Sequence, residues 1–522
     1  MKLAKPILLI AFLAALEGCH VPLRPYRIDK PAIVVPPDAT DPPPGVSIAS
    51  QEKPCLSAEN PICLAFIEVD DMGELFDKSE VDTALRVIRQ ANDLARSNPG
   101  HDPIVITFVH GWKNNASETN GNVAGFKVAL QEVYRRFGKT HRVIGIFIGW
   151  RGNLIRDSWF VAQQLSYYNR EATAIRVPGA TLSSALTEIA ARTHENEHAL
   201  AIYIGHSFGG LLLERTLSEA TASQIAQASI FSQEANAAPK DSQESNEKEI
   251  AARLATDSRA DLVIFINPAG AATEAKQMLD FLTYNGYRYQ PFMQSEADEG
   301  PAAVPSPNQS DDRPLFVSLT STADLATKVA MPIGHWWPDL KFKSAGSFRD
   351  LSDEPNKKYD LACFDPHNKQ HEHWELKRKA EGAQPQSAYY MSTAPHMQVL
   401  QSHTMLKAIG TNQMQVSSTG QKITIQDPNA IAQCNRDLFN KQGLNIVSTF
   451  RLADTGACFA VQERPNRCNG TPYWLMEIDP DVVPDHSTIF TQRFISFLID
   501  TYFTPQGQPL QRLNPRMMQT SH

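Results

Sequence analysis

The sequence predicts an α/β fold with a mostly parallel sheet flanked by helices, and two observations lead to this fold class. Short apolar runs rich in Ile, Val and Phe recur along the chain, and amphipathic segments lie between most of them. The runs are nearly continuous, as expected for strands that are buried on both faces of a parallel sheet. Strands that alternate with helices imply right-handed crossovers and a sheet covered on both sides.

The individual elements follow from this pattern. Strands are predicted over 63–69, 104–109, 143–148, 200–204, 262–266, 315–319 and 473–478. Leu182, Leu186 and Ile189 fall at i, i+4 and i+7, and therefore lie on one helical face. Helices are predicted over 81–94, 126–137, 182–191, 211–220 and 272–282. Ligands in such sheets bind at the carboxyl ends of the strands, so functional residues are expected in the loops that follow strands.

The composition is that of a globular protein. The 522 residues are 42 % hydrophobic and 20 % charged, which fits one large domain with insertions or two domains. The formal net charge is -8, and no long run of Lys or Arg occurs. The charge pattern therefore argues against a nucleic-acid partner.

The N-terminus has the features of an export signal. Lys2 and Lys5 precede an apolar stretch, 7–16, that is too short to span a bilayer, so 1–18 is predicted to be a secretory signal peptide. Its end, Leu16-Glu17-Gly18-Cys19, resembles the lipobox of bacterial lipoproteins. The resemblance implies cleavage before Cys19 and a lipid anchor on that residue.

Two residues qualify the lipoprotein interpretation. Glu17 departs from the small or apolar residue usual at its position, and the alternative is a plain signal peptide with an incidental cysteine. Lipoproteins kept at the inner membrane usually carry aspartate after the cysteine, and here that residue is His20. If the source is Gram-negative, the expected location is the outer membrane, facing the periplasm or the cell surface.

The next segment, 19–60, is rich in proline and has no hydrophobic period, so it is predicted to be an extended tether. Beyond Cys19 the chain has an even number of cysteines, which in an oxidising compartment suggests up to three disulfides. Short separations favour the pairs Cys55 with Cys63 and Cys458 with Cys468, which leaves Cys363 and Cys434. No Cys-x-x-Cys spacing indicates a metal site.

A glycine-rich turn follows the strand predicted at 200–204. Gly205-His206-Ser207-Phe208-Gly209-Gly210 matches Gly-x-Ser-x-Gly, with a predicted strand before it and a predicted helix after it. Such a turn is so tight that side chains at the flanking glycine positions would collide. The alternative is an ordinary glycine-rich turn with a surface serine. The context favours Ser207 as an exposed nucleophile.

Together with Phe108-Val109-His110-Gly111-Trp112 and Ile148-Gly149-Trp150-Arg151-Gly152, this turn resembles the α/β-hydrolase superfamily, and its lipases and esterases in particular. The resemblance covers roughly 63–327 plus 473–503. It implies an oxyanion hole made of the backbone N–H groups of Phe208 and Trp112, with Gly111 as the alternative to Trp112. His110 would shape the loop, and the side chains of Trp112 and Trp150 are expected to be packing residues.

In this superfamily an acid and then a histidine follow the serine along the chain. His486 has the best context, since it comes shortly after the last predicted strand and before an amphipathic helix. His396 and His403 stay open as alternatives. The run His371-Glu372-His373 is interpreted as a solvated helix face rather than a metal site.

Asp324 is the expected acid. The superfamily's acid usually follows the next-to-last strand, and 315–319 runs into Thr320-Ser321-Thr322-Ala323-Asp324. The strand before it runs into Asn267-Pro268-Ala269-Gly270, which offers no carboxylate. Asp324 could instead be the N-cap of a short helical turn, and Asp311 and Asp312 are the next candidates for the acid.

The chain is longer than a minimal hydrolase requires. The hydrolase core is predicted over 61–333 and 471–505, with a disulfide-containing cap over the strand ends at 334–470. Within that cap, the tryptophans of His335-Trp336-Trp337-Pro338 are expected either beside the pocket or in a core. Polar or proline-rich insertions are expected at 232–249 and 291–314.

Two function classes follow. The leading one is a serine hydrolase that cleaves carboxylic esters of small molecules or lipids, with an acyltransferase or thioesterase as its variant; neither needs a cofactor or a metal. The other is a binding lipoprotein that has kept the fold without the activity. Because every part of the catalytic apparatus has a candidate residue, the sequence favours the hydrolase. The acyl and alcohol specificity and the oligomeric state stay open.

Overall fold

The structure is a computed structural model. It describes residues 24–27, 46–49, 55–56, 61–153, 167–239, 242–270, 278, 315–321, 323–324, 326, 397–401, 446–451, 458–463, 473–478, 480 and 482–499. For the strands at 397–401, 446–451 and 458–463, and for 474–477, it describes the backbone without side chains.

The described residues form an α/β fold around one sheet, in the order β1-β2-β4-β3-β5-β6-β7-β11-β8-β10-β9. Among the described strands β10 pairs antiparallel with both β8 and β9, and the other strand pairs are parallel. The bounds are β1 Val46–Ile48, β2 Ile62–Glu68, β3 Asp102–Val109, β4 His141–Gly149, β5 Leu200–His206, β6 Leu262–Ile266, β7 Phe316–Ser321, β8 Met397–Gln401, β9 Ile446–Arg451, β10 Cys458–Glu463 and β11 Tyr473–Ile478. The prediction of a mostly parallel sheet is confirmed, and all the predicted strands form within two residues of their expected ends.

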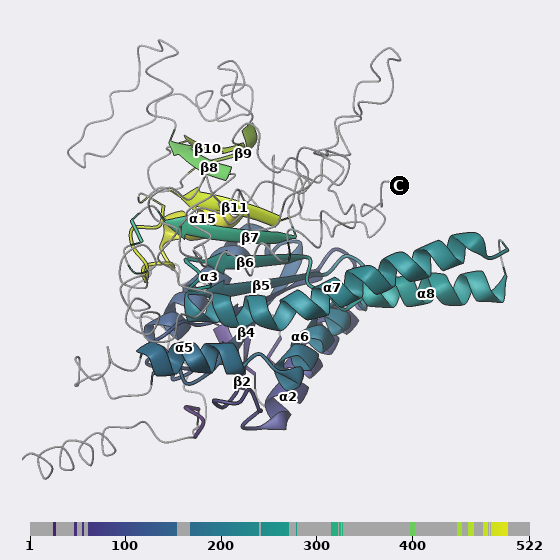
Figure 1. The fold of residues 1–522 in the computed structure, drawn as a ribbon, viewed down its shortest axis with the longest axis horizontal. Helices are drawn as coiled ribbons and strands as arrows, with labels where there is room; N and C mark the ends of the chain where they lie inside the picture. The colour runs from purple at the N-terminus through teal and green to yellow at the C-terminus, as the bar shows by residue number, and fades with distance from the viewer. Residues whose placement is uncertain are drawn as a thin grey trace, which may run out of the picture.

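Helices cover both faces of this sheet (Figure 1). Alternate residues of each strand point to opposite faces: in β4, Ile144 and Ile146 lie in one apolar cluster, and Val143 and Phe147 lie in the other. The first cluster includes residues of α2 (Lys78–Ser97), α5 (Tyr167–Arg176), α6 (Ala180–Thr193) and α7 (Phe208–Ala237). The second includes residues of α3 (Gly121–Phe137) and α15 (Gln492–Leu498).

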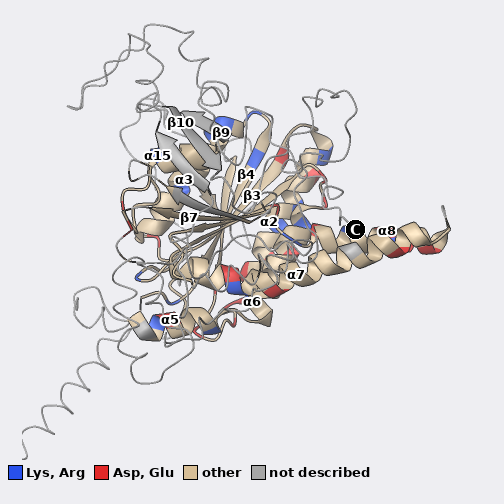
Figure 2. Cartoon of the chain, turned by 45° about the horizontal axis from the view of Figure 1, so that its top comes forward, with Lys and Arg blue, Asp and Glu red and all other residues tan. Residues whose placement is uncertain are grey.

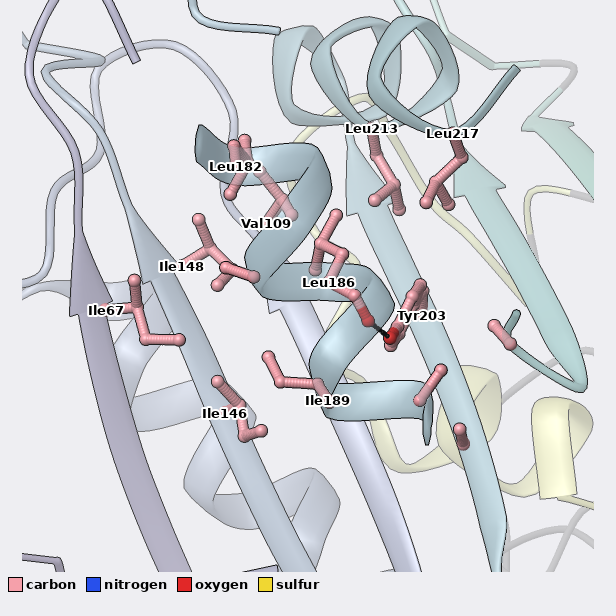
Figure 3. Packing of buried hydrophobic residues seen from close by; sticks show 14 of the residues in the cluster. Ile67, Val109, Ile146, Ile148, Leu182, Leu186, Ile189, Tyr203, Leu213 and Leu217 are labelled. Atoms are coloured by element: carbon pink, nitrogen blue, oxygen red, sulfur yellow. Dashed lines mark hydrogen bonds between the residues drawn. The ribbon is translucent and has the colours of Figure 1, made fainter. Parts of the chain in front are cut away.

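Helix α6 illustrates how the spacing in the sequence produces this packing. Leu182, Leu186 and Ile189 are fully buried against the strands, among them β5 with Tyr203 (Figure 3). The Tyr203 hydroxyl donates a hydrogen bond to the Leu186 carbonyl oxygen, so this buried hydroxyl is satisfied. Each leucine buried in this way stabilises the fold by about 1.5–3 kcal/mol.

The helices differ from prediction at two places. Helix α5 was not predicted from the sequence. The segment 232–249, expected as a polar insertion, continues α7 to Ala237 and then enters α8 (Gln243–Asp257), which runs back along α7 as a projecting hairpin (Figure 1). The Ser242 side chain caps α8 by accepting a hydrogen bond from the Ser245 N–H at 3.1 Å. The helix predicted over 272–282 lies, apart from Met278, outside the described residues.

The predicted cap, 334–470, is described only in its strands. β8, β9 and β10 continue the sheet beyond β11 and so lie at its edge. The rest of the cap, including 335–338, and the side chains of Cys363, Cys434, Cys458 and Cys468 lie outside the described residues. A cap over the strand ends and its disulfides stay predictions.

The predicted tether, 19–60, is not free along its whole length. Residues 24–27 pack against the core, because the backbone N–H groups of Tyr26 and Arg27 donate hydrogen bonds to the Glu68 carboxylate at 2.8 and 2.9 Å. Further along, β1 pairs in parallel with β2, and Cys55 forms a disulfide with Cys63, as the short separation predicted. The other residues of the tether and the signal peptide, with Cys19, lie outside the described part of the chain.

The apolarity of the helices and the distribution of charge are properties of the described residues as a whole. No described helix combines the length and the apolarity needed to cross a membrane. Basic and acidic residues are interspersed over the described elements (Figure 2).

Candidate active site

Ser207 lies in the sharp turn between β5 and α7. Its backbone has φ 56° and ψ −123°, a conformation that residues other than glycine rarely adopt. The turn is fixed on both sides, since the Ser207 N–H donates to the Ile266 carbonyl at 3.0 Å and the Ala269 N–H donates to the Ser207 carbonyl at 3.1 Å. The strained turn is therefore held by the carboxyl end of the neighbouring strand β6.

The flanking glycines are required by contact. A Cβ on Gly205 would lie 2.7 Å from the Gly209 carbonyl oxygen, and a Cβ on Gly209 would lie 2.3 Å from the Val109 carbonyl oxygen. These atoms belong to the backbone and cannot rotate away. A side chain at either flanking position would therefore collide with the backbone, which explains why glycines flank the serine in the Gly-x-Ser-x-Gly pattern.

The structure brings Ser207, His486 and Asp324 together from the ends of β5, β11 and β7. His486 Nε2 lies 2.8 Å from Ser207 Oγ, and His486 Nδ1 lies 3.0 Å from both carboxylate oxygens of Asp324. A carboxylate only accepts hydrogen bonds, so Nδ1 carries the ring proton and Nε2 is the acceptor of the neutral ring. His486 is therefore placed to take the Ser207 proton.

Asp324 makes the contacts expected for both of the positions considered for it, an N-cap and a partner of His486. Its side chain is fully buried, and Oδ1 also accepts a hydrogen bond from the Ala326 N–H at 2.9 Å, as an N-capping aspartate would. The same carboxylate faces His486 at the end of a different strand. Buried charge is costly unless it is paired and hydrogen-bonded, and these contacts supply that pairing.

The loop after β3 lies directly beside the serine. A Cβ on Gly111 would be 2.8 Å from Ser207 Cβ, so no other side chain fits there. The ring of Trp112 lies 6.4 Å from that of Phe208, so the loop after β3 contacts the start of α7 next to Ser207. The three residues expected to supply oxyanion N–H groups, Gly111, Trp112 and Phe208, are thus brought to one place.

His110 shapes this loop through hydrogen bonds. Its Nε2 accepts from the Trp150 N–H at 3.1 Å, so Nδ1 carries the proton and donates to the Gly111 carbonyl at 2.9 Å. The Trp150 indole N–H donates to the His110 carbonyl at 2.7 Å, and the two rings stack. Burial lowers the pKa of His110 to about 4, which keeps the ring neutral.

Two residues that position the site were not identified from the sequence. His206 Nε2 donates to the His486 carbonyl at 2.8 Å, and burial, followed by the nearby His486, lowers the pKa of His206 to about 3. Asn267, with φ 44°, donates from its side-chain amide to the carbonyls of Asp485 and His486 and accepts from the Ser321 N–H. The sequence signal for Asn267 was an asparagine at a strand end, a residue type that tolerates positive φ.

Other predicted residues are not placed. His396, His403, Asp311, Asp312 and the run 371–373 lie outside the described residues. Within the described part of the chain, no group of three or more His, Cys, Asp or Glu side chains is arranged to hold a metal ion.

Comparisons of the chain with protein-family models, with curated proteins and with solved structures found no match. The functional assignment therefore depends on the chemistry of these side chains and their geometry.

Proposed function

We propose that the protein is a serine hydrolase of the α/β-hydrolase fold that cleaves carboxylic esters through an acyl-enzyme. One observation carries the proposal: the hydrogen-bonded chain from Ser207 Oγ through the His486 ring to the Asp324 carboxylate, with distances of 2.8 and 3.0 Å. A serine needs a base to become nucleophilic, and the base needs a carboxylate that fixes its tautomer. Each link has its partner here.

In the first half-reaction, Ser207 Oγ attacks the carbonyl carbon of the ester while its proton passes to His486 Nε2. The carbonyl oxygen becomes an oxyanion, and the N–H of Phe208, with that of Trp112 or Gly111, stabilises it. Each preorganised donor of this kind contributes about 3 kcal/mol to transition-state stabilisation. The C–O bond to the alcohol then breaks, and the alcohol leaves with the proton from His486.

In the second half-reaction, water replaces the alcohol. His486 Nε2 accepts a proton from the water as its oxygen attacks the acyl carbon, and the same oxyanion site is used again. The bond to Ser207 then breaks, the serine takes its proton back from His486, and the carboxylic acid is released. Asp324 stays ionised throughout and stabilises the imidazolium that forms in both steps.

The alternative functions differ in which of these residues they would need. An acyltransferase or thioesterase would use the same acyl-enzyme with another acceptor or leaving group. A binding lipoprotein without activity would have no need for a serine held at φ 56° beside a histidine and a buried carboxylate. Strained backbone persists where the surrounding structure enforces it, and such residues cluster at active sites.

The test is a panel of fluorogenic esters of increasing acyl length with purified wild-type protein, Ser207→Ala and Ser97→Ala. Ser97 is an exposed serine at the end of α2 and serves as the matched control. We expect Ser207→Ala to lower turnover roughly 10⁴-fold or more and Ser97→Ala to leave it unchanged. Equal turnover by all three proteins would refute the proposal.

Lipid anchoring belongs to the same proposal. We propose that Cys19 is acylated after signal-peptide cleavage and that the protein faces the periplasm or the cell surface from the outer membrane. The supporting feature is the Leu16-Glu17-Gly18-Cys19 sequence. Metabolic labelling with a fatty acid should tag the wild type, and Cys19→Ser should release the chain from membranes; an untagged, soluble wild type would refute it.

A further inference from the structure

The segment 24–27 is bound to the core by specific contacts. Beyond the two backbone hydrogen bonds to Glu68, the Arg27 guanidinium forms an ion pair with Glu118 at 3.3 Å and lies 3.6 Å from the centre of the Phe66 ring. The Tyr26 hydroxyl donates to the Asn153 carbonyl at 3.1 Å. Only 9 % of the Arg27 side chain is exposed.

These contacts lie at the carboxyl ends of the strands, the same edge of the sheet that carries the catalytic residues. Glu68 is the last residue of β2 and pairs with Gly149, the last residue of β4. The next strands, β3 and β5, follow in the order of the sheet, and β5 leads into Ser207. Three interstrand spacings of ~4.8 Å place the binding point of the segment about 14 Å from the serine turn.

Helix α5 contacts both the residues that follow β2 and the start of α7. At its start, the Tyr167 ring lies 5.2 Å from the Phe208 ring. In its middle, the Arg170 guanidinium pairs with Asp71, which follows β2, at 2.9 Å.

Two exposed apolar side chains belong to this edge. Met72, in the turn after β2, is 58 % exposed, and Ile175, near the end of α5, is 41 % exposed. Val177 follows α5 and packs against this turn, since a Cβ on Gly73 would lie 2.1 Å from its carbonyl oxygen.

The docked segment begins five residues after Cys19. Five peptide units reach at most about 18 Å, so a lipid on Cys19 would hold Arg24 within that distance of the bilayer. We infer that the docked segment keeps the catalytic edge of the sheet against the membrane, and that the substrate is an ester bond of a lipid in that membrane. This inference rests on the proposed hydrolase activity and on acylation of Cys19.

The experiment uses the acylated protein reconstituted into phosphatidylethanolamine and phosphatidylglycerol vesicles that contain a fluorogenic long-chain ester. One variant carries a flexible 20-residue Gly/Ser insertion between Pro22 and Leu23, before the docked segment. The matched control carries the same insertion between Lys30 and Pro31, after it. A third variant, Tyr26→Ala with Arg27→Ala, removes the side-chain contacts that dock the segment.

Insertion before the docked segment should lower the rate on the vesicle ester roughly tenfold, since effective concentration falls as about the −3/2 power of tether length. The control insertion should leave this rate unchanged, and the double variant should lower it. All variants should hydrolyse a short water-soluble ester like the wild type, which shows that they are folded and active.

The outcomes separate the inference from the proposed function. Unchanged rates on the vesicle ester after insertion before the docked segment would overturn the inference while leaving the hydrolase in place. Equal losses from both insertions would also overturn it. Absence of turnover on either ester by the wild type would instead overturn the proposed function.

Discussion

The side-chain amide of Asn267 lies 3.2 Å from the backbone carbonyl oxygens of both Asp485 and His486. Its side-chain amide oxygen accepts from the Ser321 N–H at 2.9 Å, and the backbone N–H of Asn267 donates to the Leu319 carbonyl at 2.7 Å. One residue at the end of β6 thus connects the loops that carry the acid and the histidine. It is a positioning residue, since it touches neither the serine hydroxyl nor the histidine ring.

Asn267→Gly should therefore lower kcat roughly 10- to 100-fold, because a catalytic group displaced by about 1 Å lowers the rate of the chemical step by up to about that factor. Glycine adopts the positive φ of this position, so the backbone is kept while the side-chain hydrogen bonds are lost. KM for a short ester should change little. Asn120→Gly, which removes the N-cap of α3, is the control for loss of one side-chain hydrogen bond; an equal kcat in both variants would contradict the role of Asn267.

Asp324→Asn should be nearly inactive, with turnover lowered about 10⁴-fold, yet melt close to the wild type. The amide can still accept from the Ala326 N–H, but its NH₂ group no longer stabilises the required tautomer of His486. Asp82→Asn, at an exposed position of α2, should change neither quantity. Near-normal turnover by Asp324→Asn would move the acid elsewhere, with Asp311 and Asp312 the next to test.

Gly209→Ala should destabilise the protein by about 1–3 kcal/mol and abolish turnover, because an added Cβ would press on the backbone oxygens of Val109 and His110 at 2.3 and 2.4 Å. Relief of this contact would displace the loop that carries Gly111. Gly210→Ala is the control, since the nearest atom to its Cβ is Pro268 Cβ at 3.1 Å. Denaturant unfolding and ester turnover measure the two effects, and equal behaviour of the two variants would contradict this account of the turn.

The contribution of His110 and His206 to the free energy of unfolding should fall as the pH drops below 6.5. His110 and His206 have pKa values lowered from 6.5 to about 4 and about 3, so below 6.5 the unfolded chain binds protons that the folded chain does not. The stability that the two neutral histidines allow is fully present above pH 6.5. As the pH falls from 6.5 toward the folded pKa values, each histidine lowers the free energy of unfolding by about 1.4 kcal/mol per pH unit.

Urea unfolding between pH 7.5 and 4.5 measures this dependence. His206→Gln keeps an N–H that can donate to the His486 carbonyl and does not titrate, so its stability should fall less steeply with decreasing pH than that of the wild type. Parallel curves for the two proteins would show that His206 is not held neutral by burial.

The strands and the three residues of the hydrogen-bonded chain could be predicted because their signals are local. Apolar runs mark buried strands, and Ser207, Asp324 and His486 each come shortly after one. The role of Asn267 could not be predicted this way, because its partner Asp485 is 218 residues away in the chain. The hydrogen bonds of Asn267 form only once the ends of β6, β7 and β11 lie side by side in the folded sheet.

The α7–α8 hairpin and the docked segment were missed for related reasons. Much of the hairpin packs helix against helix away from the sheet, and its Ile230, Ile250 and Leu254 are exposed, so no apolar period marks it. Tyr26 and Arg27 lie in a proline-rich stretch with no hydrophobic period, and their binding site is Glu68, more than 40 residues later. Contacts of this kind depend on the assembled fold.

The most direct test of the central claim is labelling with a fluorophosphonate probe, followed by mass spectrometry of the modified peptide. Such probes react with a serine only where a base and an oxyanion site make it nucleophilic near neutral pH. The account predicts a single adduct on Ser207 in the wild type and none in Ser207→Ala. Equal labelling of Ser207→Ala, or no labelling of the folded wild type, would contradict it.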